Sequence, residues 1–161
     1  MSTLSIAELM VDAVVPLPPE LTDDAIASLT LHVLREEGAD GSWTIGFRFV
    51  DDDEMQRMHL DYMGLDSPTD IMTFPTEMDE WAFNGGDADD ARGGDIVISV
   101  ETAAEQASEG AWGLLEELRF LIVHGLLHLL DWDDHAEGDR AAMLDRQRAL
   151  LRSWETARAV T

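Results

Sequence analysis

The spacing of hydrophobic residues predicts alternating strands and helices in the first part of the chain. Residues 4–11 are rich in apolar residues and predict a strand, and the alternation of apolar with polar or small residues over 43–49 predicts a half-buried strand. Between them an apolar stripe at helical spacing starts after Thr22, a suitable N-cap, and stops at Gly38. A second helix is predicted over about 51–63. The predicted order is therefore strand, helix, strand, helix.

The middle of the chain predicts two further strands separated by a polar insertion. Residues 71–74 predict a short strand, and the flanking Pro68 and Pro75 prevent its extension within a central ladder. Over 76–93 the composition shifts to Asp, Glu, Gly and Asn, which predicts an exposed loop inserted between strands. Residues 93–100 then predict a buried strand.

Three helices are predicted in the remainder of the chain. The first begins at about residue 101 and is interrupted by Gly110, a long apolar helix covers about 112–130, and an amphipathic helix covers about 137–157. This order of elements predicts an α/β (α+β) fold, in which a mixed sheet of about four strands packs against about five helices. The length favours a single domain over residues 1–161.

Two histidines stand on the long apolar helix. His124 and His128 are four residues apart, so both imidazoles leave the same helix face with about 5–6 Å between their Cβ atoms. Neutral imidazole is the commonest protein ligand for zinc-like ions, and one ion can bridge two rings at this separation. Two histidines on an apolar helix are also common as ordinary buried residues, so a metal site requires a third ligand.

The chain offers several candidates for that third ligand directly after the apolar helix. The apolar run ends at Leu130 and is followed by Asp131, Trp132, Asp133, Asp134 and His135. A break at this point lets the chain turn back toward the two histidines. Because catalytic zinc is held by three protein ligands and keeps one open position, the sequence predicts one zinc-type ion at this place.

The composition limits the kind of partner and compartment. The chain has 34 acidic residues against 10 arginines, no lysine, and a formal net charge of −24. Such a surface repels nucleic acid, so an RNA or DNA partner requires a local cationic site or a metal. The absence of cysteine excludes disulfides, thiolate zinc sites and cysteine nucleophiles. No secretory leader and no apolar run of about 18 residues is present, and we expect a soluble cytoplasmic protein.

Three ordered motifs give the chain a resemblance to a known family. They read PTDIMTFP, GGDIVISVETAAEQA and VHGLLHLLDWDDH, and they resemble the PTDVLSFP, GDIVIS and HGxLHLxGYDH motifs of the YbeY family of bacterial rRNA maturation factors. The resemblance covers roughly residues 40–150. It implies a zincin-like fold, one zinc-type ion held by three histidines, and a single-strand-specific endoribonuclease acting in 16S rRNA 3′ maturation and ribosome quality control. Single-stranded RNA, rRNA and the ribosome are the partners that it implies, with no membrane.

The resemblance places the metal ligands residue by residue. The first two fall on His124 and His128, and the third histidine of the family falls on Asp134, with His135 one position further. Asp131 stands at the family's glycine, and Asp tolerates a left-handed turn. An unbroken register therefore favours Asp134, whose carboxylate is a competent zinc ligand. His135 remains the alternative, although it requires one extra residue to be absorbed before the site.

The expected substrate contacts depart from the family pattern. The family motif LNxxYR reads MHLDYM over 58–63, so His59 replaces its asparagine and Met63 replaces its phosphate-binding arginine. Arg48 and Arg119 are candidate phosphate contacts because arginine is scarce in this chain, but the many carboxylates favour an ion pair for each of them instead.

The remaining motif residues bear on the chemistry. Asp70 and Asp133 are candidates to orient the ligand imidazoles, and Asp70 can equally cap a turn after Pro68. Gly125 stands where HExxH metallopeptidases carry a glutamate base, which argues against peptidase activity. Phosphodiester hydrolysis depends less on that base, because a metal both activates water and neutralises phosphate charge.

Two functions follow from the sequence. The first is a metal-dependent endoribonuclease, whose activity is lost on chelation. The second is a catalytically weak, metal-stabilised binding module of the ribosome, for which the replacement by Met63 and the acidic surface argue.

Overall fold

The computed structural model describes residues 3–65, 69–76 and 92–160, arranged around a four-stranded mixed sheet. The strands are β1 (Ser5–Ala13), β2 (Ser42–Val50), β3 (Ile71–Pro75) and β4 (Arg92–Ser99). They lie in the order β1-β2-β4-β3, with parallel β1, β2 and β4 and an antiparallel β3 at one edge. The predicted mixed α/β fold is confirmed.

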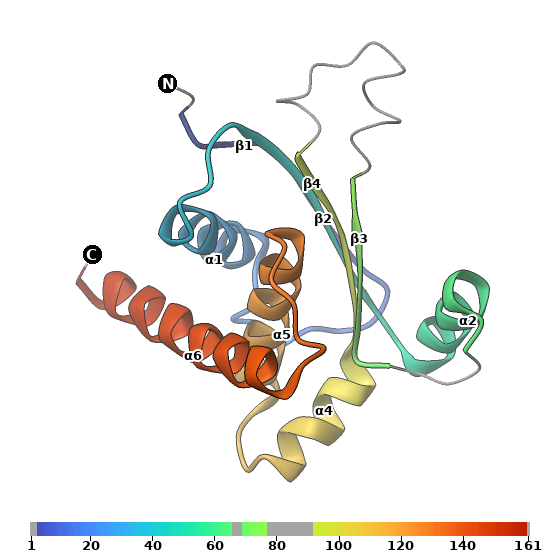
Figure 1. Cartoon of the computed structure of the whole chain (residues 1–161). Coiled ribbons are helices and arrows are strands. Elements are labelled where there is room, and N and C mark those ends of the chain that lie inside the picture. The colour runs from blue at the N-terminus through green and yellow to red at the C-terminus, as the bar shows by residue number, and fades with distance from the viewer. Residues whose placement is uncertain (1–2, 66–68, 77–91, 161) are drawn as a thin grey trace, which may run out of the picture.

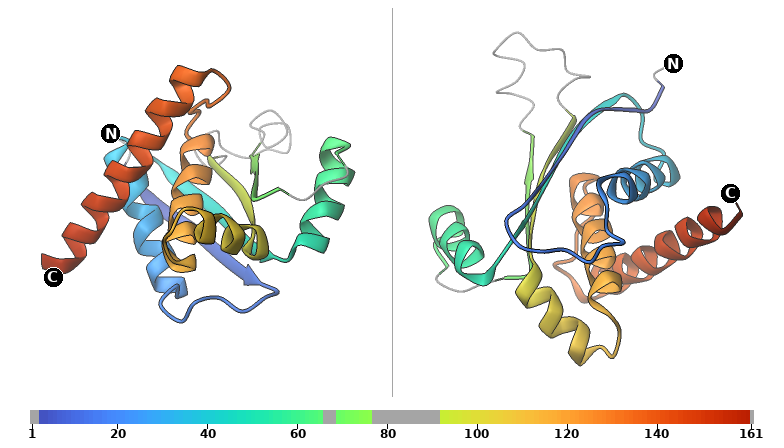
Figure 2. Two further views of the ribbon diagram at one scale, coloured as in Figure 1. Left: turned by 90° about the horizontal axis from the view of Figure 1, so that it is seen from below. Right: turned by 180° about the vertical axis from the view of Figure 1, so that it is seen from behind.

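Five helices are present in the described ranges, as predicted. They are α1 (Asp23–Glu36), α2 (Asp52–Met63), α4 (Val100–Glu109), α5 (Leu114–Leu129) and α6 (Glu137–Val160). In Figure 1, α1, α5 and α6 lie on one side of the sheet and α2 lies on the other, while α4 leads from the end of β4 toward α5. The two further views in Figure 2 show the same division. None of the described helices is long and apolar enough to cross a membrane.

Local capping explains where the helices begin and end. The Thr22 side chain accepts a hydrogen bond from the backbone N–H of Ala25 and caps α1, as predicted. The α5 helix begins two residues later than predicted because Gly113, which has an extended backbone, is its N-cap. The β1 strand continues two residues beyond its predicted end, because its parallel pairing with β2 extends to Ala13. Most of the predicted loop, residues 77–91, lies outside the described residues.

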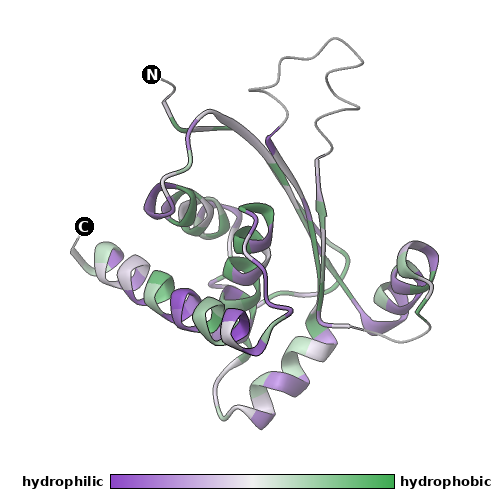
Figure 3. Cartoon of the chain, viewed as in Figure 1, coloured by the Kyte–Doolittle hydropathy of each residue, from purple (hydrophilic) through white to green (hydrophobic). Residues whose placement is uncertain are grey.

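The main apolar core lies between the sheet and α5. Phe49 and Ile96 from the strands and Ile122 from α5 are fully buried in it, and Figure 3 shows the hydrophobic colour along these elements. A Cβ atom on Gly125 would lie 2.9 Å from Ile96 Cγ2, and one on Gly94 would lie 2.9 Å from Leu129 Cδ2. Glycine at these two positions therefore allows α5 to rest directly on the strands, which fixes the helix that carries the two histidines.

A smaller apolar cluster covers part of the opposite face of the sheet. Val50, Met72 and Val97 from the strands pack there against Met55 of α2. Because only one helix of the described ranges covers this face, much of it remains accessible, including Met10 of β1, whose exposed fraction is 54%.

Candidate metal centre

Two histidines and one aspartate bring their ligand atoms together at the α5 helix. The Nε2 atoms of His124 and His128 are 3.0 Å apart. Asp134, from the loop between α5 and α6, places its Oδ2 atom 3.6 Å from Nε2 of His124 and 3.5 Å from Nε2 of His128. With zinc–ligand bonds of about 2.0–2.1 Å, the edges of a tetrahedral site measure about 3.3–3.4 Å. The three separations straddle that length, so this triad could hold a metal ion.

The triad is partly open to solvent. The exposed fractions of the side chains are 18% for His124, 24% for His128 and 30% for Asp134. Three protein ligands leave the fourth position of a tetrahedral ion for water or substrate, whereas structural zinc is closed by four ligands. The donor set and its exposure therefore match a catalytic type of metal site.

Hydrogen bonds on the far side of each ring set the imidazole tautomers. The Nδ1–H of His128 donates to the Trp132 carbonyl at 3.0 Å, and the Nδ1–H of His124 donates to Gln147 Oε1 at 3.0 Å. The amide orientation of Gln147 is fixed because its Nε2 donates to the carbonyl of Phe120 at 3.3 Å. With both Nδ1 atoms protonated, both Nε2 lone pairs face the centre of the triad, as metal binding requires.

A left-handed turn at the end of α5 delivers the third ligand. Asp131 has a φ of 72°. Its N–H donates to the carbonyl of His128, and the N–H of Trp132 donates to the carbonyl of Leu127. These two hydrogen bonds form a Schellman motif. The left-handed turn predicted at Asp131 is confirmed. The chain reverses at this point without an additional residue, and Asp134 reaches the two histidines.

Glu37 anchors the loop that carries Asp134. Its Oε1 accepts a hydrogen bond from the Trp132 indole N–H at 2.7 Å, and its Oε2 accepts one from Arg146 Nε at 2.6 Å. The side chain of Glu37 is only 10% exposed, so both bonds are shielded from water. The position of the third ligand therefore depends on α1 and α6 as well as on its own loop.

The alternative ligand and the predicted orienting residues do not take part in the triad. His135 is 90% exposed, and its Nε2 lies 3.5 Å from Asp133 Oδ1. Asp133, Asp134 and His135 also bring ligand atoms within 4.8 Å of one another, but two of these residues are exposed and neither histidine of α5 belongs to that set. Gln147 Oε1 and the Trp132 carbonyl, rather than the candidates Asp70 and Asp133, accept the hydrogen bonds from Nδ1 of the two histidines.

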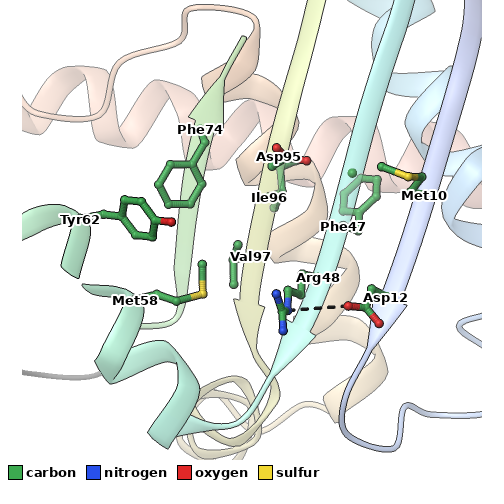
Figure 4. Close-up of a pocket in the computed structure, with 11 residues that line it drawn as sticks. Met10, Asp12, Phe47, Arg48, Met58, Tyr62, Phe74, Asp95, Ile96 and Val97 are labelled. Carbon is green, nitrogen blue, oxygen red and sulfur yellow. Dashed lines mark ion pairs between the residues drawn. The ribbon is translucent and has the colours of Figure 1, made fainter. Parts of the chain in front are cut away.

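The predicted substrate residues lie on the other side of the sheet. Arg48 forms ion pairs with Asp12 at 3.7 Å and Glu54 at 3.6 Å, and Figure 4 shows it on the open sheet face. Arg48 therefore pairs with carboxylates, which the sequence favoured over a phosphate contact, and it lies across the sheet from α5. Met63 and His59 lie on α2, with exposed fractions of 56% and 9%. The structure therefore does not gather these three predicted residues around the triad.

Sequence reasoning missed Gln147, which is fully buried between α5 and α6. A signal was present, because Gln147 interrupts the apolar stripe formed along α6 by Met143, Leu150 and Trp154. A polar residue at a core position requires a hydrogen-bond partner. The sequence did not show that its partner would be His124, 23 positions earlier.

Two further residues of α5 are constrained by their surroundings. Gly125 faces the strands, and its close approach to Ile96 leaves no room for the glutamate base of a metallopeptidase. Glu117 is buried, and this burial raises the pKa of its carboxyl group. A hydrogen bond from the Trp112 indole N–H at 2.9 Å lowers that pKa in part, and the neighbouring Asp70 carboxylate raises it.

Comparisons with known proteins support the family resemblance and the fold. A family model described as Endoribonuclease YbeY matches residues 16–155. An Endoribonuclease YbeY from Bacillus licheniformis is 36% identical over 137 residues, covering 83% of this chain and 86% of the relative. One from Salinispora tropica is 34% identical over 147 residues, covering 87% and 92%. The solution structure of a Thermotoga maritima protein superposes with a TM-score of 0.62 at 21% identity, covering 94% of this chain and 92% of that protein, and supports the fold.

Proposed function

This chain belongs to the Endoribonuclease YbeY family, and from that premise we propose that it is a metal-dependent endoribonuclease that hydrolyses phosphodiester bonds in single-stranded RNA. We propose rRNA as its substrate, in maturation of the 16S 3′ end and in ribosome quality control. The proposed partner is the ribosome and the proposed compartment is the cytoplasm. The observation that carries the catalytic part is the convergence of His124, His128 and Asp134 on one point.

Each residue of the site has a defined part in this proposal. His124 and His128 present Nε2 lone pairs, and Gln147 and the Trp132 carbonyl hold their rings in place through Nδ1. A zinc-type ion held here would lower the pKa of water to about 7 and would draw charge away from a phosphate oxygen. Asp134 contributes a negative charge where the family has a neutral histidine, which reduces the net positive charge available for both effects.

The test measures metal content and RNA cleavage on the same samples. The purified protein should contain about one equivalent of a zinc-type ion, as expected for a three-ligand site, and should cleave short single-stranded RNA until a chelator is added. His128→Ala and Asp134→Ala should lose the ion and the cleavage, whereas the exposed His135→Ala should retain most of both. Unchanged metal content in His128→Ala would contradict the site. Loss of the ion in His135→Ala but not in Asp134→Ala would identify His135 as the third ligand. Metal binding without any RNA cleavage would instead support the ribosome-binding module.

A further inference from the structure

A hollow between α5 and α6 gathers three of the ten arginines of this acidic chain. It has a volume of about 280 Å³, and its lining includes Arg119, Arg148 and Arg152. Trp112 and Phe120 also line it, with their rings edge to face at a centroid distance of 5.4 Å. Two carboxylates, Glu116 and Glu155, line the same hollow. The hollow thus has more arginines than carboxylates, whereas the whole chain has 34 acidic residues and only 10 arginines.

Arg148 and Arg152 of the hollow are less tightly paired than Arg92 and Arg146. Arg92 and Arg146 lie 2.6 Å from the carboxylate oxygens of Asp40 and Glu37. Arg152, in contrast, makes no ion pair with any residue in the described ranges, and the pair of Arg148 with Asp145 is 3.3 Å long and solvent-exposed. Positive charge is therefore available at this hollow for an external anion.

Arg119 is the third guanidinium group of the hollow and forms no ion pair in the described part of the chain. Its Nε atom is buried and has no hydrogen-bond partner among the described residues, and its guanidinium group lies 5.1 Å from the centre of the Trp154 ring. A buried donor without an acceptor is energetically unfavourable. An anionic or carbonyl-bearing ligand in the hollow would supply acceptors close to this guanidinium group.

The hollow adjoins the metal centre. Phe120, which lines the hollow, precedes His124 by one helical turn, a rise of about 6 Å. Gln147 connects the two places, since it accepts a hydrogen bond from His124 and donates one to the carbonyl of Phe120. Arg148 follows Gln147 directly on α6. A single strand that reaches the triad can therefore also reach the hollow.

Arginine and an exposed aromatic ring together fit one class of ligand. Single-stranded RNA is bound by cationic groups that contact its phosphates and by aromatic rings on which its bases stack. Trp112 is 40% exposed and supplies such a ring. We propose that this hollow binds one nucleotide of the RNA strand next to the cleaved bond, with its phosphate on Arg148 and Arg152 and its base against Trp112. This inference rests on the proposed endoribonuclease function and adds the location of a substrate subsite.

The test measures binding separately from cleavage. Fluorescence anisotropy of a short fluorescein-labelled single-stranded RNA, with chelator present to prevent hydrolysis, should show about ten-fold weaker binding by Arg152→Glu than by the unmodified protein. The slope of log K against log salt should also become shallower by about 0.7 for each phosphate group that the variant no longer neutralises. Arg57→Glu is the matched control, because it makes the same charge change on α2, where Arg57 is 72% exposed. Trp112→Ala should weaken binding at least about five-fold, because the base can no longer stack on the indole ring.

The outcomes separate this inference from the proposed function. If Arg152→Glu and Arg57→Glu weaken RNA binding equally, or if neither does, the hollow is not a subsite. Cleavage of RNA by the metal-loaded protein would still support the proposed function. If the unmodified protein neither binds nor cleaves RNA, the proposed function fails and the subsite with it. Thermal unfolding of each variant verifies the fold, and Arg152→Glu remains decisive if Trp112→Ala proves unstable, because residue 152 is exposed on α6.

Discussion

The two faces of the sheet differ in how completely they are covered, and the metal centre belongs to the covered one. On the α5 face Phe49 and Ile96 are fully buried. On the α2 face Met10 is 54% exposed, and a hollow of about 490 Å³ lies between β1, β2, β4 and α2. Figure 4 shows Met10, Arg48, Tyr62 and Phe74 around that hollow. The covered face thus holds a helix rigidly, while the open face leaves its side chains accessible.

This difference explains which site residues came together. The triad needs ligand atoms held within a few tenths of an ångström, and the packing of α5 on the strands provides that rigidity. Arg48, on the open face, instead pairs with the nearest carboxylates. The scarcity of arginine therefore did not predict which residues come together, whereas the four-residue spacing correctly predicted that His124 and His128 lie side by side.

The largest expected contrast between the faces is in stability. Phe49→Ala should lower the free energy of unfolding by about 3–5 kcal/mol, because it leaves a cavity in the main core. Met10→Ala on the exposed part of the other face should change it by less than about 0.5 kcal/mol. Chemical denaturation of the two variants measures the difference. Equal losses would show that the open face is covered in solution, for example by a second copy of the chain.

A cation on the open side tests whether α2 takes part in substrate binding. Met63→Arg restores the family's arginine, but Met63 lies across the sheet from the triad, so RNA cleavage should rise only as far as one added positive charge weakens the overall repulsion of RNA. Leu60→Arg makes the same charge change on an exposed position of α2 and serves as the control. Steady-state kinetics of both variants compare them. The two rises should be equal, and a rise of about 10²-fold in Met63→Arg alone would show that this position neutralises phosphate charge in the transition state.

Replacement of the buried Gln147 should weaken metal binding on the covered face without abolishing it. Gln147→Leu removes the acceptor for His124 Nδ1–H and leaves the ring free to rotate, so metal affinity should fall by about 10–100-fold. Gln147→Glu retains an acceptor and should lose less affinity. Competition with a zinc-binding dye measures both. Unchanged affinity in Gln147→Leu would show that the ring of His124 is oriented by packing alone.

The smallest expected effect concerns Glu117 and pH. Because burial raises its pKa, the folded protein binds this proton more tightly than the unfolded chain does. The resulting stability is fully present below the ordinary carboxyl pKa and is lost as pH rises through the raised one. Glu117→Gln keeps an acceptor for the Trp112 indole and should remove this loss, so the variant should gain stability relative to the unmodified protein between acid and neutral pH. Denaturation at several pH values tests this, with the exposed Glu105→Gln as control.

Local pattern was sufficient for most of the elements. The caps at Thr22 and the left-handed residue Asp131 are decided by backbone groups within a few positions. The alternation over 43–49 and the stripe on α5 are also short-range periodicities, and they identified the half-buried strand and the helix that carries the histidines. The end of β1 was misjudged because its length follows from pairing with another strand.

The sequence by itself determined that His124 and His128 share one helix face, since a four-residue spacing places both rings on that face whatever surrounds them. Only the tertiary structure decided what holds those rings and the third ligand. Gln147 lies 23 positions from His124, and Glu37 lies 95 positions from Trp132. Local periodicity carries no information about contacts at such separations, because they depend on how helices and strands pack after they have formed.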